Sequence, residues 1–148
     1  MVTTTRYEFT IIGKPFGKQR PRFARRGRFS KAFTPTETVN YEVQVRETFV
    51  RECNPTNLLQ GPLRATITAH HPIPKSVSKK KRQLMLDGHI RPELMPDADN
   101  IAKVVLDALN QMAYADDKSI VELVVIKYYS EQPCVEVEIH QIGGLSTE

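Results

Sequence analysis

The sequence contains no tryptophan and only two cysteines, Cys53 and Cys134, which lie far apart. Without a Cys-x-x-Cys pair, a disulfide framework or a thiolate zinc site is not expected, and a reducing compartment fits. No apolar run approaches the roughly 18 residues that a membrane span needs, and the first residues have no secretory apolar region. We therefore expect a cytoplasmic protein without membrane contact.

Acidic residues are missing from one long stretch. Residues 9–36 contain no Asp or Glu but eight Lys and Arg, so this stretch carries +8 and the remainder 4 − 8 = −4 of the net charge of +4. Such segregation favours a polyanionic partner, with nucleic acid ahead of membrane because no amphipathic helix accompanies it. Phenylalanines alternate with the arginines and offer surfaces for stacking on bases.

A second basic run, "KKKR" at residues 79–82, is consistent with DNA binding and equally with the solvated face of a short helix. The DNA contacts predicted from both basic stretches are Lys14, Lys18, Arg20, Arg22, Arg25, Arg26, Arg28, Lys31, Lys79, Lys80, Lys81 and Arg82.

One domain over residues 1–148 is expected from the length. A strand is predicted at 7–13, followed by a long loop or irregular hairpin at about 13–33 that forms the basic DNA-binding loop. Thr34, Pro35 and Glu37 have the spacing of a capping box, which predicts a helix from Thr34 to about Cys53.

That helix has two apolar stripes on opposite sides. The first contains Tyr41, Val45 and Phe49, and the second contains Val39, Val43 and Val50. A helix that is apolar on two sides is buried on both, so we expect it at the centre of the domain or at a subunit interface.

The later segments predict a strand at 63–71, a short helix capped by Ser78 and closed near Gly88, and a second principal helix at about 100–112. Two strands joined by a short turn around 130–133 are predicted to close the chain as an antiparallel hairpin. Together these elements predict an α+β fold around a small mixed β-sheet with two principal helices.

Aspartates flank the second principal helix. Asp97 and Asp99 precede it, and Asp116 and Asp117 follow it. A straight helix of about 13 residues is roughly 20 Å long, so the two pairs can share a metal only if residues 111–117 double back or if the site forms between subunits. Carboxylates of this kind suit Mg²⁺ or Mn²⁺ in phosphodiester hydrolysis. Lys103, one turn after Asp99, could stabilise charge on the phosphate.

Ordinary structural roles explain the same residues. Asp99 is a candidate helix N-cap, Asp99 and Lys103 form a plausible surface pair, and "ADDKS" is typical of a polar turn. A calcium-binding EF-hand loop is a poorer fit, because the glycine and the closing glutamate that it requires are absent.

The stretch "PDADNIAKVVLDALNQMAYADDKSIVELVV" at residues 96–125 resembles the RusA family of Holliday-junction resolvases, which are crossover junction endodeoxyribonucleases. The resemblance lies in the pattern D-x-D-N-x-x-K, then L-D-A-L-N, then Y-x-D-D and a strand. Weaker similarity extends to "GKPFGKQRPRFARRG" and "PKSVSKKKRQLM", so it covers most of the chain.

The resemblance implies a catalytic segment at about 96–120, in which Asp97, Asp99 and Asp117 bind the catalytic ion and Lys103 is the essential basic residue. The spacing before "DD" is one residue shorter than in some members, so Asp116 is the alternative third ligand. Asn100 and Asp107 belong to the motif without an assigned role.

The implied protein is a homodimeric, RusA-like, Mg²⁺-dependent endodeoxyribonuclease, with Mn²⁺ as the alternative ion and no small-molecule cofactor. It would be encoded by a bacterium or a phage, and it would resolve four-way DNA junctions by paired symmetric nicks in recombination and repair. Two rival hypotheses are a non-catalytic, structure-selective DNA-binding protein and a nuclease for other branched DNA such as flaps and forks.

Overall fold

A four-stranded sheet forms the centre of the computed structural model, which describes residues 3–26 and 29–143. Its strands lie in the order β1-β6-β4-β5, where β1 is Arg6–Ile12, β4 is Leu63–Pro72, β5 is Ile120–Ser130 and β6 is Cys134–Gln141. Strand β6 pairs antiparallel with both β1 and β4, whereas β4 and β5 are parallel. The predicted α+β fold around a small mixed sheet is therefore confirmed.

The predicted antiparallel hairpin of the last two strands is wrong. Strand β6 lies between β1 and β4, and β5 lies at the edge beyond β4, so the turn between β5 and β6 steps across β4. Strand β6 buries Val135, Val137 and Ile139 almost completely, which suits a strand with a neighbour on each side. Residues 121–124 of β5 are all exposed, as expected only at a sheet edge.

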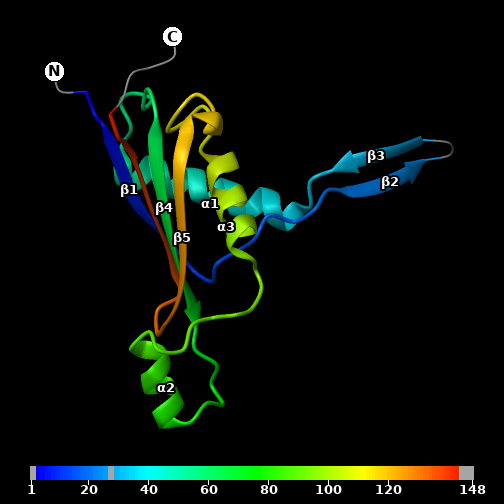
Figure 1. Cartoon of the computed structure of the whole chain (residues 1–148). Coiled ribbons are helices and arrows are strands. Elements are labelled where there is room, and N and C mark those ends of the chain that lie inside the picture. The colour runs from blue at the N-terminus through cyan, green and yellow to red at the C-terminus, as the bar shows by residue number, and fades with distance from the viewer. Residues whose placement is uncertain (1–2, 27–28, 144–148) are drawn as a thin grey trace.

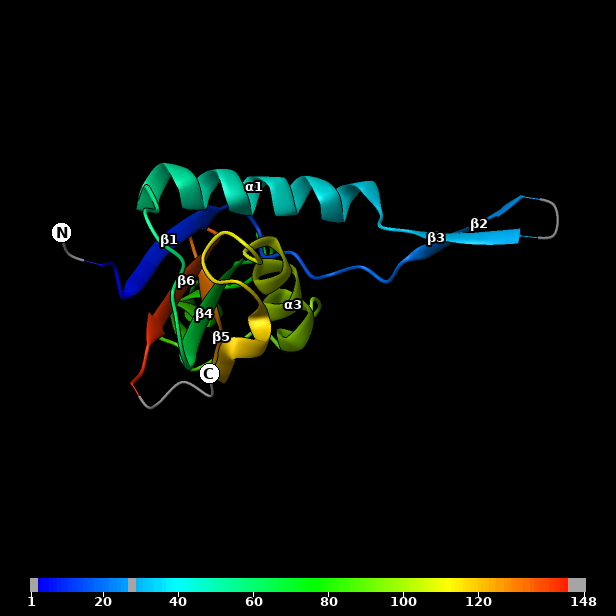
Figure 2. The same cartoon turned by 90° about the horizontal axis from the view of Figure 1, so that it is seen from above.

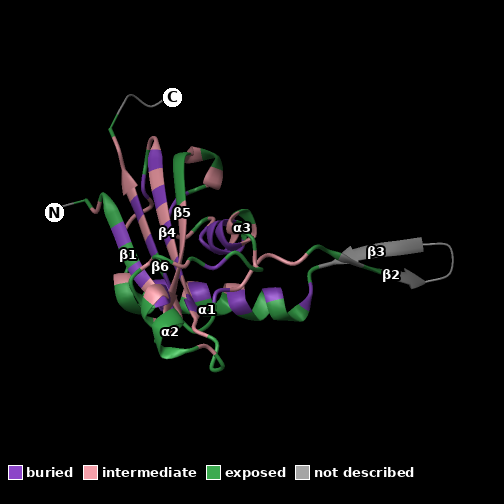
Figure 3. Ribbon diagram, turned by 60° about the horizontal axis from the view of Figure 1, so that its bottom comes forward, coloured by how far each residue is buried: buried purple, intermediate pink, exposed green. Residues whose placement is uncertain are grey.

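Two helices cover one face of the sheet (Figures 1 and 2). Helix α1 (Thr36–Cys53) packs on β1 and on α3 (Ala98–Ala108), which lies near β5. The inward side chains of both helices join those of the strands in one core. Figure 3 colours the buried residues of these helices and strands purple. Helix α2 (Lys79–Leu86) stands at the end of the sheet.

The first helix differs from the prediction at its start and on its outer side. It begins at Thr36 with Pro35 as N-cap and without a side-chain cap hydrogen bond, so the predicted capping box does not form. The predicted end at Cys53 is confirmed. A place at the centre of the domain is wrong, because the second stripe is open in this chain: Val39, Val43 and Val50 are 42%, 39% and 47% exposed. Burial of this stripe at a subunit interface stays a prediction.

The other helices are close to their predicted positions. Ser78 caps α2 by accepting a hydrogen bond from the Lys81 N–H, as expected, and Gly88 follows the helix with a positive φ of 80°. Helix α3 begins at Ala98 rather than at residue 100 and ends at Ala108 rather than at residue 112, because a turn replaces its last predicted residues.

A second sheet consists of the hairpin β2 (Arg22–Arg26) and β3 (Phe29–Phe33), which extends away from the main sheet (Figures 1 and 2). The hairpin alternative for the basic loop is therefore correct, but the expected irregularity is wrong, because the two strands pair in one continuous antiparallel register. We call residues 14–33 the basic arm. Within the described residues, no helix has both the length and the apolar character to cross a membrane.

Two buried tyrosines differ in their hydrogen bonding, and this predicts different effects of removing their hydroxyls. Tyr114 donates to the Leu106 carbonyl at 2.7 Å, which satisfies a carbonyl near the end of α3. Tyr41 has a buried hydroxyl without a partner among the described residues. Tyr114→Phe should lower the free energy of unfolding by about 1–3 kcal/mol, whereas Tyr41→Phe should leave it unchanged or raise it. Urea denaturation measures the free energy of unfolding of both variants. Equal losses of free energy would contradict the conclusion that only the Tyr114 hydroxyl makes a stabilising hydrogen bond.

Candidate metal and nucleic-acid site

The start of α3 presents two carboxylates to solvent. Asp97 is the N-cap residue and Asp99 lies in the first turn, so the capping role considered for Asp99 is wrong. The Asp97 side chain makes no cap hydrogen bond, and the ion pairs among the described residues include neither aspartate. Both side chains are therefore open oxygen ligands of the type that Mg²⁺ prefers.

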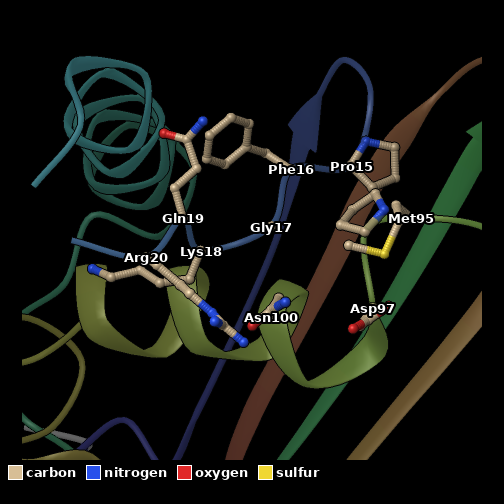
Figure 4. Close-up of a pocket in the computed structure, with 10 residues that line it drawn as sticks. Pro15, Phe16, Gly17, Lys18, Gln19, Arg20, Met95, Asp97 and Asn100 are labelled. Atoms are coloured by element: carbon tan, nitrogen blue, oxygen red, sulfur yellow. The ribbon is translucent and has the colours of Figure 1, made fainter. Parts of the chain in front are cut away.

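The base of the basic arm lies directly against this helix start. The Lys18 N–H donates to the Asn100 carbonyl at 2.9 Å. A Cβ on Gly17 would stand 2.5 Å from the Cβ of Pro96, so only glycine permits so close an approach. Figure 4 shows the groove between the two segments, with Lys18 and Arg20 above α3 and with Asp97 and Asn100 on the helix. The groove is lined by Pro15, Phe16, Gly17, Lys18, Gln19, Arg20, Met95, Pro96, Asp97 and Asn100.

The segment before α3 is attached to strand β5. The Lys127 ammonium donates to the carbonyls of Leu94 at 2.6 Å and Pro96 at 3.0 Å. Arg91 donates to the Lys127 carbonyl at 2.7 Å and lies 3.9 Å from the centre of the Tyr128 ring. Asp97 is therefore held beside residue 127 of β5.

Asp107 joins two lysines from different parts of the chain. Its carboxylate lies 3.2 Å from the Lys103 ammonium and 3.3 Å from that of Lys18, which also bonds Glu42 at 3.0 Å. The hydrogen bond from Lys103 to Asp107 is the main reason why the pKa of Lys103 is raised, and the charges of Asp107, Asp117 and Asp116 raise it further. Asp107 thus orients Lys103, a role that the sequence motif did not reveal.

The second pair of aspartates lies beyond the other end of α3, in the short turn that leads into β5. The Asp117 N–H donates to the Asn110 side-chain oxygen at 3.0 Å, and the Asp116 carboxylate accepts from the Lys118 N–H at 2.9 Å. The buried Tyr114 anchors this turn to the last turn of α3. The chain therefore doubles back only partway, toward Lys103.

Within residues 3–26 and 29–143, no group of three or more His, Cys, Asp or Glu is close enough to hold a metal ion. One chain thus brings Asp97 and Asp99 together at one end of α3. It brings Asp116 and Asp117 toward Lys103 at the other.

The residues predicted to contact DNA lie in three places. Lys14 and Arg20 are exposed at the base of the arm, while Arg22, Arg25, Arg26 and Lys31 lie on its two strands and Arg28 is outside the described residues. Lys79, Lys80 and Lys81 are exposed on α2, and Arg82 pairs with Glu131 at 3.2 Å.

The phenylalanines of the arm have different roles. Phe16 stacks on Tyr41 with ring centres 5.1 Å apart and packs against the core, so it supports the arm. Phe23 is 71% exposed and is available for stacking on a base.

Sequence reasoning missed Gly17, Glu42, Asn110 and Lys127 as residues that shape the site. Asn110 stands within the "LDALN" pattern, which was a usable signal. Gly17 and Lys127 act through contacts with residues far away in the chain, and no local pattern indicates them.

A basic arm attached beside open carboxylates has the features expected of an enzyme that acts on the phosphate backbone of nucleic acid. The family described as Endodeoxyribonuclease RusA matches residues 13–140, and the chain belongs to this family. Membership implies an endodeoxyribonuclease that acts on branched DNA junctions. The chain is also similar to the uncharacterized protein YqaN of Bacillus subtilis (strain 168), with 37% identity over 139 residues that cover 93% of this chain and 97% of that protein.

The hydrogen bond of Lys103 predicts a change in its titration. Asp107→Asn removes both the bond and the charge, so the pKa of Lys103 should fall. Glu42→Gln is the matched control, because Glu42 contacts Lys18 but not Lys103. NMR titration of the lysine side chains measures the two pKa values, and equal changes in both variants would contradict the orienting role of Asp107.

Proposed function

We propose that this protein is a Mg²⁺-dependent endodeoxyribonuclease that resolves four-way DNA junctions by paired symmetric nicks in recombination and repair. The observation that carries the proposal is the pair of open carboxylates at the start of α3, Asp97 and Asp99, of which Asp97 lines the groove beside the attachment point of the basic arm. Family membership supports the same activity.

Asp97, Asp99 and Asp117 would hold the ion, with Asp116 as the alternative third ligand and Mn²⁺ as the alternative ion. When bound, such an ion neutralises charge on the scissile phosphate and lowers the pKa of a water that attacks in line. Lys103, oriented by its hydrogen bond to Asp107, would stabilise the charge that develops on the phosphate.

The basic arm would bind the DNA backbone and bring it to the carboxylates. Lys14 and Arg20 are exposed at the arm's base, and Arg20 lines the groove that leads to Asp97. Contacts with the phosphate backbone do not distinguish one base sequence from another. The shape of the junction would therefore select the substrate.

A homodimer would match the symmetry of the substrate. A four-way junction has an approximate twofold axis, and two ligatable duplexes require two matched nicks. A dimer with twofold symmetry supplies one site for each nick.

Asp99→Asn tests the catalytic proposal. Loss of a ligand should remove several kcal/mol of transition-state stabilisation, so cleavage of a synthetic four-way junction with Mg²⁺ should fall by about a hundredfold or more. Glu93→Gln, another exposed carboxylate before α3, is the matched control and should cut at the wild-type rate. An Asp99→Asn variant that cuts normally would overturn the assignment. Preferred cleavage of flaps or forks in a competition assay would support the rival substrate class.

The arm should determine the salt dependence of DNA binding. Arg20→Gln should weaken junction binding and reduce the slope of log K against log salt concentration by about 0.9 for each phosphate that the variant no longer neutralises. Arg51→Gln, an exposed arginine at the other end of α1, is the matched control. Fluorescence anisotropy at several salt concentrations measures the slope. The same slope for both variants would show that the arm does not bind phosphates.

A further inference from the structure

The segment that leads into the start of α3 has little backbone structure of its own. Residues 89–97, which we call the strap, join α2 to α3 and contain no helix or strand. Among the described residues, the backbone groups of 91–96 make no hydrogen bond with other backbone groups. Pro92 is the one buried residue of the strap. Side-chain contacts must therefore determine where Asp97, the last residue of the strap, is placed.

Strand β5 contacts the strap on both sides of the sheet. Lys127 lies opposite the fully buried Ala69 of β4, so its side chain is on the helix-covered side, whereas that of Tyr128 is on the open side. On the open side, the Arg91 guanidinium lies 3.9 Å from the centre of the Tyr128 ring. Arg91 also donates to the Lys127 carbonyl at the free edge of β5. The strap thus crosses this edge and ends on the helix-covered side.

The Lys127 ammonium fixes the peptide group that carries Asp97. It donates to the carbonyls of Leu94 at 2.6 Å and Pro96 at 3.0 Å. The Pro96 carbonyl and the Asp97 N–H belong to one planar peptide group, so holding this carbonyl also holds the Asp97 Cα. Hydrogen bonds from a charged donor are stronger than those from a neutral one. Lys127 therefore restricts the position from which the Asp97 carboxylate extends.

We propose that Lys127 is a positioning residue that sets the affinity of the Asp97 and Asp99 carboxylates for a divalent cation. This inference rests on the proposed function for the identity of the site. The Asp97 side chain makes no cap hydrogen bond, so the N-terminus of α3 does not orient it. Groups that orient a metal ligand without touching the ion contribute about 10–100-fold to metal affinity.

The charge of Lys127 and its hydrogen bonds have opposite effects on cation binding. An ammonium near the site repels a divalent cation, so removal of the charge alone would tighten binding. Loss of the two hydrogen bonds would free the end of the strap and weaken binding. The direction of the change in a variant without the ammonium therefore distinguishes positioning from simple electrostatics.

Lys127→Met tests the proposal, because methionine keeps most of the apolar side chain but cannot donate to the carbonyls. The dissociation constant for Mn²⁺, measured by electron paramagnetic resonance without DNA, should rise about tenfold or more. Lys127→Arg can donate to both carbonyls and should restore most of the affinity. Lys75→Met removes an exposed lysine outside the strap and is the matched control, which should bind Mn²⁺ like the wild type. Unchanged or tighter binding by Lys127→Met would overturn the proposal.

A measurement without metal separates this inference from the proposed function. In Lys127→Met the ¹⁵N NMR order parameter of the Asp97 amide should fall from about 0.85, typical of rigid backbone, toward the values below about 0.6 of flexible backbone. The order parameters of β4 should stay the same, which shows that the fold is intact. An unchanged value at Asp97 would overturn the positioning role. If the wild type binds Mn²⁺ but cuts no branched DNA, the proposed function fails, while both experiments still decide the role of Lys127.

Discussion

The parallel pairing of β4 with β5 is the constraint on which the rest of the structure depends. Parallel neighbours cannot be joined by a tight turn, so the chain between them must return along the sheet. Residues 73–119 make this return and contain α2, α3 and the Asp116–Asp117 turn. Because α3 lies within the crossover, one of its ends meets the far end of β5 at Lys127, and the other leads into the start of β5. The separation of the two aspartate pairs follows from this geometry.

The arm and the carboxylates are coupled at one place, where the segment at Gly17 and Lys18 lies against the first turns of α3. From there the Lys18 side chain reaches the last turn of α3, where its ion pair with Asp107 is only partly buried, with side-chain exposures of 24% for Lys18 and 21% for Asp107. Pairs near a surface contribute roughly 1 kcal/mol or less to stability. Their main effect is therefore on position: they orient Lys103 and fix the Lys18 side chain along α3, while the hydrogen bond from the Lys18 N–H to the Asn100 carbonyl holds the base of the arm close to Asp97.

Patterns contained within one segment predicted local structure well. Helix α1 ends at Cys53 and α2 is capped by Ser78, as their residues indicate. Strand β4 buries alternate residues, as its strict alternation requires. Three local predictions failed: the capping box before α1 does not form, Asp97 rather than Asp99 is the N-cap of α3, and α3 begins and ends earlier than predicted. The larger errors concern relations between segments. The final strands are not paired with each other, and the second valine stripe of α1 is open, because a pattern of period two or 3.6 specifies which face is apolar but not what covers it.

The sequence by itself determined the charge segregation, the helix that presents Asp97 and Asp99, and the family to which the chain belongs, because each is written in consecutive residues. Only the tertiary structure decided that Asp107 holds Lys103 and Lys18 together, that Lys127 holds the start of α3, and that β5 is an uncovered edge. These features depend on contacts between residues far apart in the chain. Strand order and side-chain contacts of this kind are settled when the core packs, and no single segment encodes them.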